Sequence, residues 1–277
     1  MNSRERVLRA LHLQEGRPDR PPLQFDLCRT LTDHFAEKLN IPADYAQSYY
    51  EDLTYRISAN AVRTAMGSDC VVVGGTVKEG YSPKPIAGEV SENEFGMHMK
   101  PTPLYMEVVA CPLASASSVE DVENYAFPDP YAPGRFVKAQ RDIREYKESH
   151  FIIGDCELSI FELAWHLTGM QEYMLAMAME EPWIHVLNDR VEAWTLGLAT
   201  QLVKAGVDAI WFGEDLGTQS SMLISPDMWR KEFKPRYARM IKRLKAVRKD
   251  VVFIIHSAGA VAPLVDDFIE IGFWVYI

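Results

Sequence analysis

Two acidic residues and a histidine follow apolar runs in the second half of the chain, where residues of these types can carry out acid–base chemistry. Glu214 and Asp215 come directly after the run 207–212, and His256 follows the run 251–255. Each run has the length and composition of a buried parallel strand. Side chains at the carboxyl ends of parallel strands meet in the ligand site of such folds. We therefore predict that Glu214, Asp215 and His256 are catalytic residues.

A third apolar run ends in the same way. The run 151–155 carries Asp155 at its end, and Cys156 and Glu157 follow it. Because this run is also typical of a parallel strand, its last side chains can reach the same pocket, and Asp155 and Glu157 are predicted to bind the substrate. Cys156 has no basic residue near it in the sequence, so a nucleophilic role is not expected.

These residues also have structural interpretations, which the sequence leaves open. Glu214 and Asp215 can cap the turn that follows them, and His256 can be a histidine whose hydrogen bonds are satisfied inside the protein. A site role is favoured for the two acids because adjacent carboxylates at a strand end cost free energy to bury without a purpose.

The elements that must position these residues are strands that alternate with helices. Strands are predicted at 23–27, 69–73, 151–155, 207–212, 251–255 and 273–277, and helices at 42–66, 136–149, 160–179, 182–206 and from Ser225 onwards. Residues 76–112 interrupt this rhythm with Gly, Pro and short alternating runs, which indicates a β-hairpin insertion. The alternation predicts a single α/β domain over residues 1–277, with a parallel sheet. It is either an incomplete TIM (β/α)8-type barrel of about six βα units or an open sheet.

The composition is that of an ordinary globular protein. The 277 residues are 48% hydrophobic and 25% charged, with a formal net charge of −10. This acidic balance argues against a nucleic-acid partner, which requires a surplus of Lys and Arg. No apolar run is long enough to span a membrane, and the first residues lack the hydrophobic core of a signal peptide. A cytoplasmic protein that acts on a small-molecule substrate is therefore expected.

Several short motifs, in the same order along nearly the whole chain, resemble the uroporphyrinogen decarboxylase superfamily. They are Arg4-Glu-Arg-Val-Leu-Arg-Ala-Leu, Pro18-Asp-Arg-Pro-Pro, Gly67-Ser-Asp-Cys-Val-Val-Val, Glu94-Phe-Gly, Pro112-Leu-Ala, Phe127-Pro-Asp-Pro, Glu214-Asp-Leu-Gly-Thr-Gln, Ser225-Pro and His256-Ser-Ala-Gly. The superfamily also includes corrinoid-dependent methyltransferases that act on methylated thiols, amines and aryl ethers. The resemblance implies a TIM barrel whose site lies at the carboxyl ends of the strands.

The decarboxylase branch of the superfamily implies one set of site residues. Its arginines after the first Asp-Arg-Pro segment hold the acidic side chains of a porphyrinogen, because guanidinium groups pair with carboxylates through two hydrogen bonds. The corresponding stretch 23–29 of this chain has a single arginine, Arg29, and adds Asp26 as a candidate substrate-binding residue. Asp69 matches the catalytic Asp of the decarboxylases. Trp165 falls near their active-site Tyr and is a further candidate for substrate binding.

The turn from Glu214 to Gln219 resembles the methyltransferase branch more closely, and it adds Gln219 as a candidate substrate-binding residue. Zinc-dependent members use a His-x-Cys segment and a later Cys, and the Zn²⁺ stabilises the substrate thiolate. Here the segment reads His256-Ser-Ala258, so His256 is the one candidate metal ligand left and zinc binding is not favoured. The predicted reaction is methyl transfer that involves a corrinoid protein, with an acidic group assisting the departure of the leaving group.

Two alternatives remain beside this prediction. One is decarboxylation of uroporphyrinogen in porphyrin and haem biosynthesis, a lyase reaction that needs no cofactor. The other is a non-catalytic binding protein, because Ala258 replaces the family Cys and the chain resembles a barrel truncated at its C-terminus. The sequence also leaves open whether the chain forms a homodimer.

Overall fold

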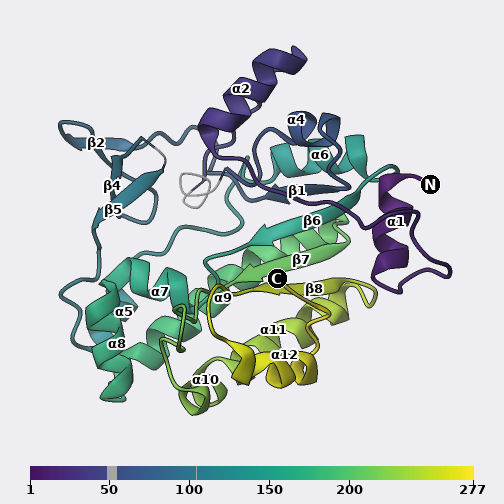
Figure 1. Ribbon diagram of the computed structural model, residues 1–277. Coiled ribbons are helices and arrows are strands. Elements are labelled where there is room, and N and C mark those ends of the chain that lie inside the picture. Colours follow the sequence, from purple (N-terminus) through teal and green to yellow (C-terminus); the bar gives the residue numbers. More distant parts are fainter. Residues whose placement is uncertain (49–54, 104) are drawn as a thin grey trace.

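A parallel sheet forms the centre of the molecule. The computed structural model describes residues 1–48, 55–103 and 105–277. Its central sheet has five parallel strands in the order β1 (Cys70–Gly74), β6 (Phe151–Cys156), β7 (Ala209–Gly213), β8 (Val252–His256) and β9 (Val275–Tyr276) (Figure 1). The predicted α/β class with a parallel sheet is confirmed. Consecutive strands are neighbours, as in the wall of a barrel, but β1 and β9 do not pair with each other, so the described strands form an open sheet.

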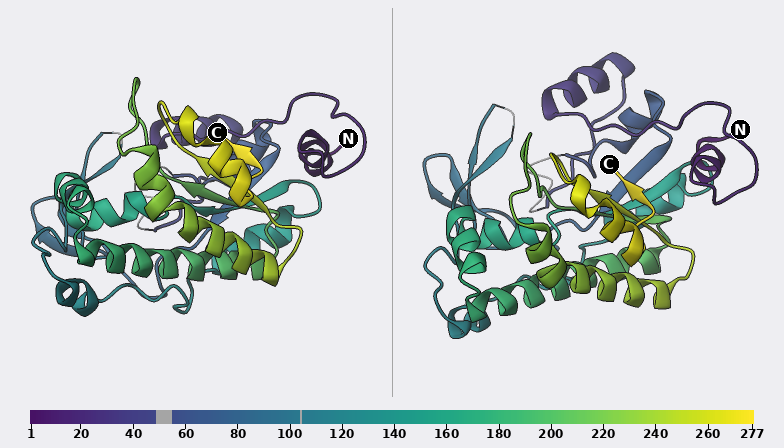
Figure 2. Two further views of the ribbon diagram at one scale, coloured as in Figure 1. Left: turned by 90° about the horizontal axis from the view of Figure 1, so that it is seen from below. Right: turned by 60° about the horizontal axis from the view of Figure 1, so that its bottom comes forward.

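Long helices cover one face of this sheet. α6 (Val137–Tyr146) contacts β1 and β6, α9 (Pro182–Ala205) contacts β6 and β7, and α11 (Lys234–Val247) packs between α9 and α12 (Val265–Ile271). Figure 2 shows α9 and α11 running side by side along the sheet. The strand residues that face these helices belong to the main hydrophobic core; they include Val71, Ile152, Ile210 and Phe253. No helix of the described residues has both the length and the apolar composition needed to cross a membrane.

The opposite face of the sheet has its own, smaller core. It contains the alternate residues of each strand together with Val7 of α1 (Ser3–Ala10), and its strand members are Cys70, Val72, Phe151, Ile153, Ala209, Trp211, Val252 and Ile254. Because successive side chains of a strand point to opposite faces, this set defines a second face, away from α6, α9 and α11. The candidate site residues must be sorted between these two faces.

The segment between β1 and β6 forms a separate antiparallel sheet. Its four strands, β2 (Lys84–Ala87), β3 (Val90–Glu92), β4 (His98–Pro101) and β5 (Met106–Ala110), pair in sequence order. The stretch expected to hold one hairpin therefore holds a four-stranded meander. Gly88 and Gly96, at φ of 57° and 75°, lie in two of its turns, where glycine adopts the left-handed conformation without steric cost.

The remaining helices are short, and several have the predicted ends. They are α2 (Arg29–Leu39), α4 (Asn60–Ala65), α5 (Val119–Asn124), α7 (Phe161–Thr168), α8 (Met170–Ala178), α10 (Pro226–Glu232) and the 3₁₀ helix η1 (Ala262–Leu264). Ser225 caps α10 by accepting the Met228 N–H, and α9 ends at Gly206 with φ of 103°. The helical region expected over 160–179 is divided between α7 and α8 by Gly169, at φ of 97°.

Two predicted elements are wrong where the structure describes them. Residues 23–27 form no strand; the Leu23 carbonyl accepts the Asp69 N–H at 2.7 Å, just before β1. The helix predicted over 42–66 is absent at 42–48, only α4 is helical within 55–66, and residues 49–54 lie outside the described residues. Tyr55 and Ala59 adopt φ of 55° and 52°, which a right-handed helix cannot accommodate.

The side-chain hydrogen bonds of Asn60, the first residue of α4, explain why the chain turns before this helix. Its side-chain amide donates to the Val72 carbonyl at 2.8 Å and accepts the Val72 N–H at 3.3 Å. These are backbone groups on the edge of β1 that does not face β6. The amide thus takes the place of a neighbouring strand at this point, because buried backbone groups must find hydrogen-bond partners.

Candidate active site

The alternation of side chains along the strands decides which candidates share a pocket. Asp155 is in register with Trp211, and Trp211 with Ile254, so all three lie on the face away from the long helices. His256 follows Ile254 by two residues and lies on the same face. The structure therefore brings Asp155 and His256 to one edge of one face, at the carboxyl ends of β6 and β8.

Glu157 extends this edge over the end of β7. Gly213 is in register with His256 and presents no side chain to the site. A Cβ atom on Gly213 would lie 2.2 Å from Cγ of Glu157, so the glutamate occupies the space that a side chain at 213 would need. Glu157 can join the site because residue 213, at the end of β7, has no side chain.

Arg56, from the turn before α4, holds the acidic residues of this edge together. It forms an ion pair with Glu157, its Nη1 lies 3.6 Å from Asp155 Oδ1, and its Nε donates to Asp26 Oδ2 at 2.8 Å. Its guanidinium carbon also lies 4.4 Å from the centroid of the Trp211 ring, a cation–π contact. One buried arginine is thus shared among three carboxylates.

This environment strongly shifts the pKa of Asp155. Its burial raises its pKa to about 7; Arg56 opposes the increase and Asp26 adds to it. A small cavity borders its carboxyl group, and the cavity is lined by Asp155, Glu157, Gly74, Gly75, Ser48, Ile57 and Leu198. A carboxyl group with this pKa can hold or release a proton near neutral pH.

Asp215 and His256 form an acid–base pair at the rim. His256 Nε2 lies 3.5 Å from Asp215 Oδ1, and the same oxygen accepts the Ala258 N–H at 2.9 Å. His256 lowers the pKa of Asp215, against the effect of partial burial. Both side chains are partly exposed, and the His256 ring lies 6.2 Å from the Trp211 ring. A substrate at this edge can reach the imidazole.

Glu214 lies on the other face of the sheet, so the structure does not place it with Asp155 and His256. Its carboxylate accepts the backbone N–H groups of Ile160, Phe161 and Glu162 at 2.6, 2.9 and 2.9 Å, and it accepts the Tyr237 hydroxyl. These N–H groups belong to the start of α7 and have no partner within the helix. Burial raises the pKa of Glu214 to about 7, although all four donors favour the charged form. The prediction that Glu214 is catalytic stays a prediction, and its contacts in the structure are those of a helix cap.

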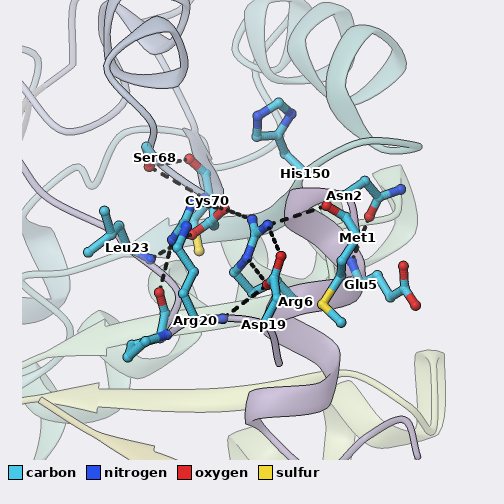
Figure 3. A network of polar contacts seen from close by, with 12 residues as sticks. Met1, Asn2, Glu5, Arg6, Asp19, Arg20, Leu23, Ser68, Cys70 and His150 are labelled. Atoms are coloured by element: carbon cyan, nitrogen blue, oxygen red, sulfur yellow. Dashed lines mark hydrogen bonds and ion pairs between the residues drawn. The ribbon is translucent and has the colours of Figure 1, made fainter. Parts of the chain in front are cut away.

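Asp69 also lies away from the site, at the amino end of β1. Its carboxylate accepts hydrogen bonds from Arg6 at 2.6 Å, from Arg20 at 2.7 Å and from the Leu23 N–H at 2.8 Å. Figure 3 shows Arg6, Arg20 and Leu23 in the same network of polar contacts. Burial alone would raise the pKa of Asp69, but the donors from Arg20 and Leu23 outweigh it and the pKa is lowered. Asp69 precedes β1, whereas Asp155 and His256 lie where their strands end, so the structure does not bring Asp69 together with them.

The other predicted substrate-binding residues have different surroundings. Asp26 is accessible and pairs with Arg56, so it belongs to the site. Trp165 lies on α7, partly buried, and stacks on His166 with ring centroids 3.7 Å apart. Gln219 is exposed in the loop between β7 and α10. Within this loop, Gly217 and Met222 form an isolated antiparallel bridge.

Two functional candidates were missed in the sequence. Arg56 falls in the segment predicted as a continuous helix, so nothing along the chain pointed it towards Asp155. Glu162 is buried in the first turn of α7, where burial, followed by the charges of Glu214 and Asp215, raises its pKa well above the usual value. A glutamate at the start of an apolar helix was the available signal, and it is a common feature of helix starts.

The residues of this edge do not fit a zinc site of the thiol-activating type. His256 has Asp215 beside it, but Ala258 supplies no ligand atom. Among the described residues, no three His, Cys, Asp or Glu side chains come together as a group that could hold a metal ion. A structural or catalytic zinc needs at least three protein ligands around one point.

Comparisons with known proteins identify the family and a similar fold. Residues 93–276 match the family model described as uroporphyrinogen decarboxylase (URO-D). Among solved structures, 21 chains match. One is a methyltransferase from Methanosarcina mazei, with a TM-score of 0.67 and 17% sequence identity over 100% of this chain and 75% of that chain. This similarity supports the fold. The search of curated proteins found no match.

Proposed function

Because the chain belongs to the uroporphyrinogen decarboxylase (URO-D) family, we propose that it is an enzyme of this family that transfers a methyl group from a small molecule to a corrinoid protein. The reaction is assigned to the carboxyl ends of β6, β7 and β8. The methyltransferase from Methanosarcina mazei has a similar fold and supports the choice of methyl transfer as the reaction to test.

The observation that carries the proposal is the charge of the site. Asp26, Asp155 and Glu157 surround Arg56, which is already engaged by them. A porphyrinogen with many carboxylates needs arginines that are free to pair with it, and Asp26 and Glu157 would instead repel it. A neutral or cationic methyl donor meets no such repulsion.

The end of β1 supports the same choice. The residues there are Gly74 and Gly75, and the acid of this strand, Asp69, lies at its other end. β1 therefore places no carboxylate in the site that could hold the pyrrole N–H groups of a porphyrinogen. The side chains of Ile57 and Leu198 pack against these two glycines.

In the proposed reaction, the residues of the chain bind the methyl donor and control proton transfer to its heteroatom. The corrinoid, carried by the partner protein, supplies the nucleophile that accepts the methyl group. Trp211 forms the wall of the site, and His256, oriented by Asp215, hydrogen-bonds the heteroatom that carries the methyl group. Closing the site against water strengthens these polar contacts.

Methyl transfer can be tested with the purified chain and reduced cobalamin as the acceptor. Methanol, methylamines, methyl thioethers and aryl methyl ethers are offered as donors, and demethylated product is quantified. We expect one donor class to be turned over, and His256→Ala to lower its rate about 100-fold or more. Asp227→Asn, a change at an exposed residue of α10, serves as the control and should leave the rate unchanged.

The competing reaction is decarboxylation, because the matching family model carries that description. The same preparation is incubated with uroporphyrinogen without any added cofactor. Formation of coproporphyrinogen at a catalytic rate, with no methyl transfer from any donor, would replace the methyltransferase proposal by the decarboxylase one.

A further inference from the structure

Methyl transfer from a neutral donor leaves a negative charge that needs a proton. The acceptor's electron pair forms a bond to the methyl carbon, and the bond between that carbon and the donor heteroatom breaks. The electron pair of the broken bond stays on the heteroatom. For an ether or an amine this gives an alkoxide, phenolate or amide anion, which is a poor leaving group unless an acid protonates it.

The carboxyl groups of the site differ in their ability to supply this proton. Glu157 is held in an ion pair by Arg56, and Asp26 is accessible and bound to the same guanidinium. Asp215 faces His256 and stays ionised, and Glu214 is on the other face of the sheet. Asp155 remains as a buried carboxyl group on the substrate side of the sheet.

Building on the proposed function, we propose that Asp155 is the catalytic acid that protonates the leaving heteroatom. Three features of the geometry support this role. Its side chain lies on the same face as Trp211, at the carboxyl end of β6. The nearest Arg56 nitrogen is 3.6 Å away, longer than a normal hydrogen bond, because the guanidinium is directed to Glu157 and Asp26. A small cavity lies beside the residue, and Gly74, Gly75 and Glu157 border it.

The charges around Asp155 come from three segments. Arg56 and, farther away, Arg63 of α4 favour its ionised form, whereas Asp26 in the extended segment after Leu23 favours its protonated form. Glu157, directly after β6, donates its backbone N–H to Asp155 Oδ1 at 3.4 Å. The neighbouring strands contribute Gly74 and Trp211, which carry no charge. Burial exceeds these opposing effects and raises the pKa of Asp155 to about 7, so that protonated and ionised forms coexist near neutral pH.

The step is balanced as follows. Asp155 begins as a carboxylic acid and gives its proton to the heteroatom as the carbon–heteroatom bond breaks, so the demethylated product leaves neutral. Asp155 becomes a carboxylate, which Arg56 stabilises, and it takes a new proton from water before the next turnover. The methyl carbon moves to the reduced corrinoid without any change in the protein's own oxidation state.

The first test compares two donors in wild type and Asp155→Asn, with reduced cobalamin as the acceptor. An aryl methyl ether must be protonated as it leaves, whereas trimethylsulfonium leaves as neutral dimethyl sulfide and needs no proton. We expect Asp155→Asn to lower the ether rate about 100-fold or more and to change the sulfonium rate less than about threefold. Equal losses on both donors, or no loss on the ether, would overturn the role of Asp155 as the acid.

The second test does not depend on activity. The infrared difference spectrum between wild type and Asp155→Asn is recorded from pH 5 to 9, and it should contain the carbonyl band of a protonated carboxylic acid that disappears with a midpoint near pH 7. An ionised Asp155 at pH 5.5 would contradict the inference. If wild type transfers no methyl group while the band titrates as expected, the proposed function fails and the protonation of Asp155 stands by itself.

Discussion

At the scale of single residues, Glu214 and Asp215 show how one step along the chain separates structure from chemistry. Glu214 points to the helices and accepts four hydrogen bonds at the start of α7, whereas Asp215 lies at the rim beside His256. Because side chains alternate at the end of a strand, adjacent acids cannot serve one pocket together. The pair that looked like a catalytic unit in the sequence is divided between two faces.

Glu214→Ala should destabilise the protein without abolishing its chemistry. The change leaves three backbone N–H groups and the Tyr237 hydroxyl buried without their acceptor, which costs about 3 kcal/mol or more. Urea unfolding measures this loss. Tyr237→Phe removes one of the four donors and should cost about 1 kcal/mol. A Glu214→Ala protein as stable as wild type would contradict the capping role.

At the scale of elements, the loops after β7 and β8 lock each other in place. Ala260 N–H donates to the Thr218 carbonyl at 2.8 Å, and Ala258 N–H donates to Asp215. A Cβ on Gly259 would lie 2.4 Å from backbone atoms of Gly217. The loops therefore touch through their backbones, and this contact fixes the distance between Asp215 and His256.

Gly259→Ala should disturb the site more than the strain of a left-handed alanine at this position would by itself. The clash pushes the two loops apart and should lower both the stability of the protein and its rate of methyl transfer. The rate should fall about tenfold or more, because small displacements of catalytic groups slow the reaction strongly. Gly80→Ala is the matched control: Gly80 has φ of 72°, close to the 85° of Gly259, but its Cβ would meet nothing within 4 Å. It should lose only about 1 to 2 kcal/mol from the left-handed conformation and keep its activity. Equal activity in the two variants would show that the loop contact does not position the site.

At the scale of the whole molecule, the two ends of the sheet have different roles. The amino end holds ion pairs that tie α1 and the following loop to the strands: Asp69 with Arg6 and Arg20, and Asp208 with Arg4. The carboxyl end holds Arg56, the acids around it and the pair of Asp215 with His256. This division follows the rule that parallel strands present their ligand sites where they end.

Asp69→Asn tests this division. It removes the charge of the Asp69 carboxylate, which accepts hydrogen bonds from Arg6, Arg20 and the Leu23 N–H, and should lower the free energy of unfolding by about 1 kcal/mol or more. The methyl-transfer rate per folded molecule should stay within about twofold of wild type, because the site lies at the other end of the strands. A large loss of rate in a folded Asp69→Asn protein would return Asp69 to the list of catalytic residues.

The sequence by itself determined the parallel sheet, the ends of α9 and α10, and the positions of Asp155, Asp215 and His256 at strand ends. These follow from local patterns: apolar runs of strand length, a glycine after a helix and a Ser-Pro start. The same patterns predicted a helix over 42–66, where the positive φ of Tyr55 and Ala59 shows that contacts with β1 outweigh the apolar periodicity.

Only the tertiary structure decided which of these residues share a site. It assigned Glu214 to the helix side and Asp69 to the amino end, and it brought Arg56 from a distant turn onto Trp211. Such choices depend on strand register, on the face that each side chain takes and on contacts between residues far apart in the chain. A pattern of neighbouring residue types contains none of this information, because a shift of one residue along a strand exchanges its two faces.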